Sequence, residues 1–373
     1  MMKNKLFKKA FIVGIILLFI GVSIVSGFNI QLKETEKASR GSFLYVGGSG
    51  PGNYSKIQDA INDSGDGDTV YVFNGIYYEN VRINKTINLI GEDKNTTVID
   101  GNKIGDVIFV LADFVNISGF TIQNAGSYLW KDAGIELRSY FNFISGNIIS
   151  NNSRHGIFTK ASKSDHNIVC KNIIIDNDHG VTLDCSVENE IYENYIFNNR
   201  IGIFIGVSSL LSGDVFLPLS WKSLPFEGYV NNIFGNIIKN NDIGIDIEPG
   251  CFINIFENDI LGNGIGIFLC PPSVFYCNYN YIYRNNIIDN NDFGIRLLQL
   301  ILRSTIYGNE IYYNNFINNG KNAYGNGKNI WKENYWDDWI GLKYKFLRFI
   351  PYLIPWIFFK NIDWHPILEP YDI

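Results

Sequence analysis

One phrase recurs along the middle of the chain and constrains its fold more than any other feature. Each copy begins with Asn, has Ile two residues on, Asn at five and Gly at eight, as in NYIFNNRIGIFI from Asn194. Other copies begin at Asn172, Asn236, Asn258 and Asn286, and the copy at Asn147 has one extra residue before its Gly. The copies at Asn172 and Asn194 start 22 residues apart. A repeat of this length made of short β-strands indicates a solenoid.

The apolar pattern decides which solenoid. Leucine-rich repeats share this period, but they need Leu at fixed positions and a helical arc in each unit. Here Asn and Gly interrupt every helical window, and the residues after each Gly alternate with period two. The sequence therefore predicts an all-β parallel β-helix. Its fixed inward column would consist of Ile149, Ile174, Ile196, Ile238, Ile260 and Ile288.

Equivalent residues of successive coils stack ~4.8 Å apart in such a fold. Stacked Asn side chains can hydrogen-bond to one another, which avoids a cost of roughly 1–3 kcal/mol for each unsatisfied buried group. The predicted structural ladder is Asn147, Asn172, Asn194, Asn236, Asn258 and Asn286.

The glycines at 134, 156, 180, 202, 244, 266 and 294 are expected to turn the chain at positive φ, which Gly adopts at little cost. After each Gly, the first and third residues are predicted to point inward and the second and fourth to face solvent.

The N-terminal segment points to export. A Lys-rich start and an apolar run predict that residues 1–28 are a secretory signal peptide or an N-terminal membrane anchor, followed by a polar linker over 29–42. The expected location is extracytoplasmic, secreted or anchored at the cell surface. Six Asn-x-Ser/Thr sequons, at Asn53, Asn62, Asn84, Asn95, Asn116 and Asn151, would suit a glycoprotein. The formal charge is −6, which disfavours nucleic acid as a partner.

The entry to the repeats resembles a known family. Ser55-Lys-Ile-Gln58 has the spacing of a capping box and predicts a short helix that covers the open end of the coil. Gly-Asp-Thr from Gly67, Tyr-x-Glu-Asn-Val from Tyr77 and Leu-x-Gly from Leu89 follow. With the Asn/Gly repeats and Asn334-Tyr-Trp-Asp-Asp338, this segment resembles NosD-like and carbohydrate-binding/sugar-hydrolase (CASH) β-helix surface proteins. The resemblance implies a single-stranded right-handed parallel β-helix of the pectin lyase-like fold over residues 43–340.

Two insertions, at 206–229 and 271–279, leave the same corner of the predicted coil. They could form the sides of a groove or merely cover an edge of the coil.

Residues 341–373 are expected to form a C-terminal cap, since Arg348 and two prolines interrupt their apolar stretch. Members of the resembled family share the geometry of their coils rather than a common active site. The resemblance therefore implies a fold more than an activity. A monomer is expected.

The strands after each Gly form the candidate binding face. Aromatic rings beside charged groups suit a sugar polymer, because sugar C–H faces stack on rings and hydroxyls bind charges. The predicted ligand-binding residues are Glu136, Phe158, Lys160, Phe204, Phe268 and Arg296. Glycoside hydrolysis needs two carboxylates ~5–10 Å apart, for which Asp184, Asp246 and Glu248 are the candidates. The motif sets of polygalacturonases, pectin methylesterases and lyases of this fold are absent, which disfavours an enzyme.

Three functions therefore stay open: a surface protein that binds polysaccharide or glycan, a polysaccharide hydrolase, lyase or epimerase, and a structural envelope protein. The NosD resemblance suggests copper delivery, but Met1 and Met2 are the only methionines and the four histidines have no paired spacing. We predict no metal site and no cofactor. Asp63, Asp66 and Asp68 could contact Ca²⁺, but their spacing favours a turn. A disulfide among Cys251, Cys270 and Cys277 and three free thiols are equally expected.

Overall fold

The structure is a computed structural model that describes residues 41–128, 131–160, 164–206, 230–271, 276–299, 305–355 and 361–373. The predicted signal or anchor segment (1–28), the linker up to residue 40 and most of the insertion at 206–229 lie outside these ranges, as do residues 272–275 of the second insertion. Within the described ranges, no helix is both long and apolar enough to cross a membrane.

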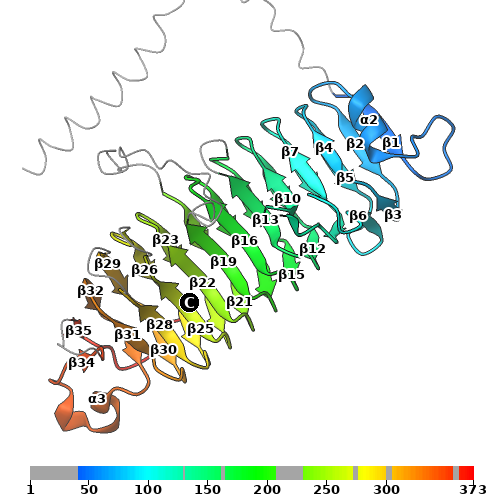
Figure 1. Cartoon of the computed structure of the whole chain (residues 1–373). Helices are drawn as coiled ribbons and strands as arrows, with labels where there is room; N and C mark the ends of the chain where they lie inside the picture. Colours follow the sequence, from blue (N-terminus) through cyan, green and yellow to red (C-terminus); the bar gives the residue numbers. More distant parts are fainter. Residues whose placement is uncertain are drawn as a thin grey trace, which may run out of the picture. The chain divides into compact units, whose positions relative to one another are not determined.

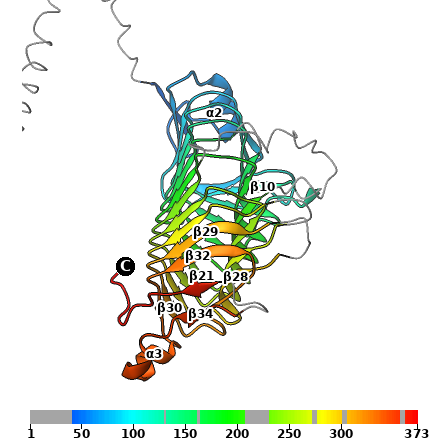
Figure 2. The same cartoon turned by 90° about the vertical axis from the view of Figure 1, so that its left-hand side faces the viewer.

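Residues 41–373 fold into a parallel β-helix, which confirms the predicted fold class (Figure 1). Each coil supplies one strand to each of three sheets, named A, B and C, and the coils follow one another along a common axis (Figure 2). Strands of the same sheet pair in parallel with the equivalent strands of the preceding and following coils.

Sheet A contains β1 (Phe43–Val46), β2 (Thr69–Val72), β5 (Asn88–Gly91), β8 (Asn116–Ser118), β11 (Phe143–Ser145), β14 (Ile168–Cys170), β17 (Glu190–Tyr192), β20 (Asn232–Phe234), β23 (Asn254–Phe256), β26 (Tyr281–Tyr283), β29 (Tyr307–Tyr312), β32 (Lys328–Lys332), β35 (Ile362–Asp363) and the antiparallel β34 (Tyr352–Leu353). Sheet B contains β3 (Gly75–Tyr78), β6 (Thr97–Asp100), β9 (Thr121–Gln123), β12 (Ile148–Ser150), β15 (Ile173–Ile175), β18 (Tyr195–Phe197), β21 (Ile237–Lys239), β24 (Asp259–Leu261), β27 (Asn286–Ile288), β30 (Asn315–Ile317) and β33 (Tyr335–Trp336).

Sheet C carries the candidate binding face. It contains β4 (Val81–Ile83), β7 (Ile108–Val110), β10 (Ala133–Leu137), β13 (His155–Lys160), β16 (His179–Asp184), β19 (Ile201–Gly206), β22 (Ile243–Glu248), β25 (Ile265–Leu269), β28 (Phe293–Leu297) and β31 (Ala323–Gly325).

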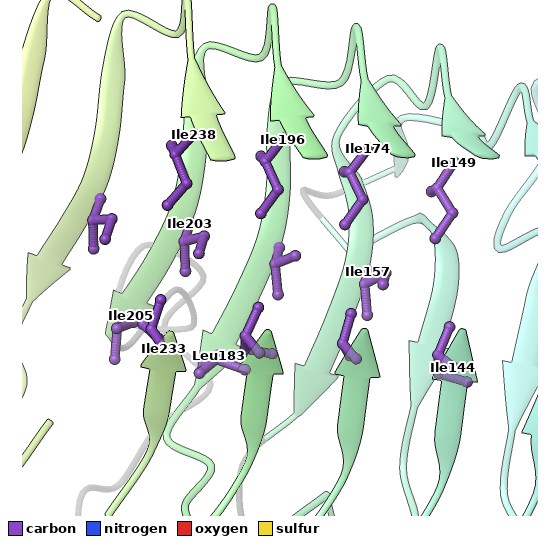
Figure 3. Close-up of a cluster of buried hydrophobic side chains, with 14 of the residues drawn as sticks. Ile144, Ile149, Ile157, Ile174, Leu183, Ile196, Ile203, Ile205, Ile233 and Ile238 are labelled. Carbon is purple, nitrogen blue, oxygen red and sulfur yellow. The ribbon is translucent and has the colours of Figure 1, made fainter. Parts of the chain in front are cut away.

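The core is a set of aliphatic columns that run along the axis (Figure 3). Ile149, Ile174, Ile196 and Ile238 from sheet B stack in one column, and none of them is exposed. The first and third residues after each repeat Gly also point inward, as predicted; Val181 and Leu183 are examples. The apolar alternation therefore maps directly onto the interior.

Asparagine ladders stabilise the corners between the sheets. In the ladder before sheet B, the backbone N–H and side-chain amide of each Asn both donate to the Oδ1 of the next Asn. The distances from Asn172 to Asn194 are 3.1 Å for both bonds. Five of the six predicted residues lie in this ladder: Asn147, Asn172, Asn194, Asn236 and Asn258. Two similar ladders pass through Asn167 and Asn189, and through Asn177 and Asn199.

The prediction for the sixth ladder residue, Asn286, is wrong by one position. Asn258 donates to Asn285 at 3.1 and 3.0 Å, and the ladder continues from Asn285 to Asn314. Ile287, not Ile288, consequently pairs with Ile260 in the inward column. The reason is one extra residue before Gly294, the same irregularity that the copy at Asn147 shows.

The repeat glycines lie inside strands of sheet C, not at positive φ, so the predicted turns are wrong. They are needed because the coils approach closely: a Cβ on Gly180 would lie 2.5 Å from the carbonyl oxygen of Gly202. Positive φ instead occurs just before the ladder Asn, as at Lys171 and Glu193. Thus Gly permits the backbones of neighbouring coils to approach closely, and a residue in the left-handed backbone conformation forms the turn between sheets.

The N-terminal helix α2 (Ile57–Asp63) covers the first coil with Ile57, Ala60 and Ile61, all buried, as predicted. Its predicted capping box is wrong, because the N-cap residue is Lys56 and makes no side-chain cap bond. The carboxylate of Glu79 accepts instead from the backbone N–H groups of Ile57 and Gln58, at 2.9 and 3.0 Å. A residue distant in sequence thus replaces the local cap.

The described chain beyond residue 339 contains short helices and strands. It forms α3 (Ile340–Lys343), the short 3₁₀ helix η4 (Lys345–Leu347) and the strands β34 and β35. The ring of Trp336 is stacked between Phe316 and Tyr352, with centroids 4.2 and 4.1 Å away. Since Tyr352 belongs to this segment, part of the segment packs against the last coils.

Candidate functional site

The outward side chains of sheet C form one register column. Successive paired positions are Arg82, Phe109, Glu136, Phe158, Thr182, Phe204, Asp246, Phe268, Arg296 and Tyr324. Aromatic residues occupy every second position. Between them the column has Arg, Glu, Thr, Asp and Arg, so that basic residues lie toward both ends and carboxyl groups lie between them.

This column is much less exposed than predicted. Phe158 is 3% exposed, Phe204 9% and Asp246 3%. Neighbouring rings cover these side chains: His155 stacks on Phe158 of the same strand at 4.7 Å, and His179 stacks on Phe204 of the next coil at 5.3 Å. The rings of Phe158 and Phe204 therefore form a floor, and only part of the face is available for contact with a ligand.

A charged network that the sequence interpretation missed lies along the corner where sheet C begins. Asp178 forms ion pairs with both Arg154 and Arg200, which belong to the coils on either side. Burial raises the pKa of Asp178, but the hydrogen bond and charge of Arg200, with His179 and Arg154, outweigh burial and lower it. The sequence did carry a signal for this network: the residue two positions before the repeat Gly alternates in charge from one repeat to the next.

His179 belongs to this network. Its Nε2 lies 2.5 Å from Nη2 of Arg200, and a guanidinium only donates, so Nε2 must accept. The hydrogen on Nδ1 is then directed at the hydroxyl of Thr182, 3.3 Å away, which also lies 2.8 Å from Nδ1 of His155. Burial, with His155 nearby, lowers the pKa of His179 to about 3. His179 is therefore a neutral, fixed ring.

Asp246 has an unusual environment for a carboxyl group. It pairs in register with Phe204 on one side and Phe268 on the other, and its Oδ1 has no hydrogen-bond partner among the described residues. Burial, and secondarily the charge of Glu248, raises its pKa well above the ordinary value. A carboxyl held in apolar surroundings stays protonated and can donate a proton.

Glu248 lies two residues beyond Asp246 on β22, so the two positions are ~6.6 Å apart on one side of the strand. Burial raises the pKa of Glu248, and Arg200 opposes this shift. A second outward column pairs Lys160, Asp184, Gly206 and Glu248. Asp184 is buried and is separated from Glu248 by one coil, so Asp246 and Glu248 are the closer pair.

A second carboxyl pair lies toward the N-terminal end of the face. Burial, followed by a hydrogen bond with Glu136, raises the pKa of Asp106 to about 8. Asp106 also accepts from the backbone N–H of Ala133 at 2.8 Å. Glu136 accepts from Nε of Arg138 at 2.5 Å. Asp106 therefore holds a proton at neutral pH, and Arg138 lies against Glu136.

The fold and the site together define the class of protein. It is a parallel β-helix protein in which one sheet carries ionisable side chains above buried aromatic rings. The chain belongs to the NosD family, described as "periplasmic copper-binding protein (NosD)", which it matches over residues 61–214 and 224–344. No curated protein matches the chain.

Solved structures resemble this one in fold. A protein of Geobacillus virus E2, ORF18, has a TM-score of 0.53 and 15% identity, over 74% of this chain and 56% of its own length. XylC in complex with xylose has a TM-score of 0.51 and 12% identity, over 79% and 71%. The tailspike gp49 of Acinetobacter baumannii bacteriophage Fri1, a capsular polysaccharide depolymerase, has a TM-score of 0.50 and 8% identity, over 75% and 54%. The chain spans about half the length of the first and third.

The family description raises copper, and the described residues do not fit it. They contain no group of three or more His, Cys, Asp or Glu that could hold a metal ion. His155 and His179 are neighbours, but Arg200 occupies Nε2 of His179, and both Nδ1 atoms face Thr182.

The thiols fit copper no better. All five cysteines are free, which answers the disulfide question for Cys251, Cys270 and Cys277. Burial raises the pKa of Cys270 to about 12, so it stays a neutral thiol, whereas the thiolate is the form that binds metal. We derive no copper chemistry from these residues.

Proposed function

We propose that this protein is exported and binds carbohydrate on the face of sheet C. The observation that carries the proposal is the partly exposed layer of charged and aromatic side chains above a floor of buried rings. Lys160, Arg200, Glu248, Phe268 and Arg296 retain exposure, while Phe158 and Phe204 lie beneath them. Charged donors and acceptors suit sugar hydroxyls, and the floor fixes their positions.

The family and the structural relatives are consistent with this proposal. NosD is described as periplasmic, which supports a location outside the cytoplasm. One relative in fold was solved with xylose and another depolymerises capsular polysaccharide. The predicted N-terminal anchor or signal would deliver the chain to such glycans.

A second candidate function is polysaccharide cleavage, favoured by Asp246. A buried, protonated carboxyl beside a second carboxyl provides the proton donor and the base that glycoside hydrolysis needs. Glu248 would act as the base, because it is the more exposed of the two. Arg200, whose charge both carboxyl groups sense, would stabilise negative charge there.

One experiment tests both. The full-length protein is incubated with a panel of neutral and acidic polysaccharides, and retention and newly formed reducing ends are measured together. Retention without new ends supports binding alone. New ends that vanish in Asp246→Asn and Glu248→Gln, but persist in the exposed control Asp292→Asn, support an enzyme. Neither retention nor new ends would refute carbohydrate binding and leave the structural role.

A further inference from the structure

We infer that the ligand of the sheet C face is a linear anionic polysaccharide that lies along the coil axis and is held near both ends of the face. This inference rests on the proposed carbohydrate binding and specifies its ligand class. It is carried by the register column, because Arg82 and Arg296 are eight coil steps apart in it, or ~38 Å.

The proximal cluster consists of Arg82, Phe109 and Arg138. The guanidinium carbons of Arg82 and Arg138 lie 5.1 and 5.0 Å from the centroid of the Phe109 ring. Arg82 is exposed and has no carboxylate within ion-pair distance among the described residues. Stacking on Phe109 therefore positions a guanidinium without neutralising it.

The distal cluster consists of Phe268, Phe293, Arg296, Lys321 and Tyr324. The guanidinium of Arg296 lies 5.6 Å from the ring of Phe268 and 4.9 Å from that of Phe293, and Lys321 lies 5.4 Å from Phe293. The Nε of Arg296 is buried and lacks a hydrogen-bond partner within the described ranges, whereas the residue as a whole is partly exposed. The exposed part of the guanidinium can therefore bind an anionic group.

Within the register column, the two carboxyl groups between the clusters do not repel such a ligand strongly. Glu136 is paired with Arg138, and the raised pKa of Asp106 keeps that neighbouring carboxyl neutral at pH 7. Asp246 is buried between two Phe positions, where the neutral form is favoured. The column therefore presents positive charge toward its ends and little net negative charge between them. The negative charge of the whole chain acts over longer distances, which salt screens beyond about 10 Å.

The geometry also determines the length of the ligand. Coil spacing is close to the length of one sugar unit in an extended chain, so one sugar unit corresponds to roughly one coil. A chain of fewer than about six units would reach one cluster, whereas a chain of about ten units would reach both. Binding at both clusters makes the second contact intramolecular and raises the apparent affinity without any new contact.

The test uses the full-length protein with size-fractionated polygalacturonate as the anionic probe and its carboxyl-reduced form as the neutral probe. Titrations measure the dissociation constants of fractions shorter than about six and longer than about ten units, at low and high salt. We expect the long anionic fraction to bind at least about tenfold more tightly than the short one, with salt weakening it. Arg82→Gln or Arg296→Gln should abolish most of this advantage, whereas Lys328→Gln, an exposed charge on sheet A, should not.

The outcomes separate the two ideas. Equal binding of the reduced and the charged probes would overturn the anionic inference and keep carbohydrate binding. Equal affinity for short and long fractions would overturn the two-cluster arrangement. Binding of neither probe, nor of any other glycan in the panel, would refute the proposed function itself. A thermal unfolding profile that matches the unsubstituted protein confirms that each variant is folded, so that a loss of binding reports on the site.

Discussion

The Oδ2 atom of Asp363 accepts from both the backbone N–H and the side-chain amide of Asn334, at 3.0 and 3.1 Å. Asn334 is the last Asn of the ladder before sheet B, so a carboxylate occupies the place of the next amide oxygen. The same Oδ2 also accepts from Nε1 of Trp336 at 3.0 Å. A carboxylate only accepts hydrogen bonds, which suits the end of a column whose members all donate in one direction.

Removal of the Asp363 carboxylate, which ends the ladder, should destabilise the C-terminal end. Asp363→Ala leaves the donors of Asn334 and Trp336 buried without an acceptor, and we expect a loss of about 3 kcal/mol or more in the free energy of unfolding. Asp363→Asn retains one acceptor oxygen and should cost about 1 kcal/mol. Urea unfolding measures both, with the exposed Asp372→Ala as control. Equal stability of all three variants would contradict the terminator role.

The corrected ladder register makes a prediction in the middle of the stack. Asn258→Ala removes the acceptor of two donors from Asn236 and should cost about 3 kcal/mol. Asn286→Ala removes a partly exposed side chain outside the buried ladder and should cost about 1 kcal/mol or less. The two variants make the same chemical change, so the thermal midpoints compare directly. A larger loss for Asn286→Ala would support the register predicted from sequence.

The distant helix cap can be tested in the same way. Glu79→Ala leaves two backbone N–H groups of α2 without their acceptor, and about 1 kcal/mol should be lost. Glu79→Gln keeps one oxygen and should lose less. Asp59→Asn, in the first turn of the same helix, serves as the control. Chemical denaturation monitored by circular dichroism gives the differences, and no change in Glu79→Ala would exclude the capping role.

Stability should depend on pH through Asp106. Its pKa is about 8 in the folded protein, against an ordinary value of 3.8. Between about pH 4 and pH 8 the folded chain keeps a proton that the unfolded chain releases, so the free energy of unfolding should fall as pH rises through this window. Asp106→Asn cannot release the proton and retains the hydrogen bonds, so it should flatten this part of the profile and be the more stable form at pH 8. A variant profile parallel to that of the unsubstituted protein would disprove the raised pKa of Asp106.

The coil itself was predictable from sequence because its determinants are local and repeated. Period-two alternation placed Val181 and Leu183 inside, and the repeated Asn placed the ladder. The single register error, at Asn286, came from one inserted residue that the Asn-rich segment concealed. Identical neighbours, as in Asn285-Asn286, leave the pattern ambiguous by one position.

The candidate site was less predictable, because its properties arise between coils. The ring of His179 that covers Phe204 comes from the preceding coil, and the Arg154–Asp178–Arg200 network joins three coils. Alternation alone shows that a side chain points outward, but it does not show what covers it. The cap by Glu79 belongs to the same class, since a carboxylate 22 residues away replaced the local signal.

The ladders also bear on how such a protein changes over evolutionary time. Asn189 donates to Asn231 across 42 residues with the same 3.0 Å backbone bond that Asn167 makes to Asn189 across 22. The ladder therefore requires only that each turn is complete. Its hydrogen bonds stay the same whatever length of chain is inserted at that corner. Duplication of one turn would extend the face by ~4.8 Å with familiar contacts. Scaffold length and loop content can thus vary separately, which would let ligand size and ligand preference evolve independently.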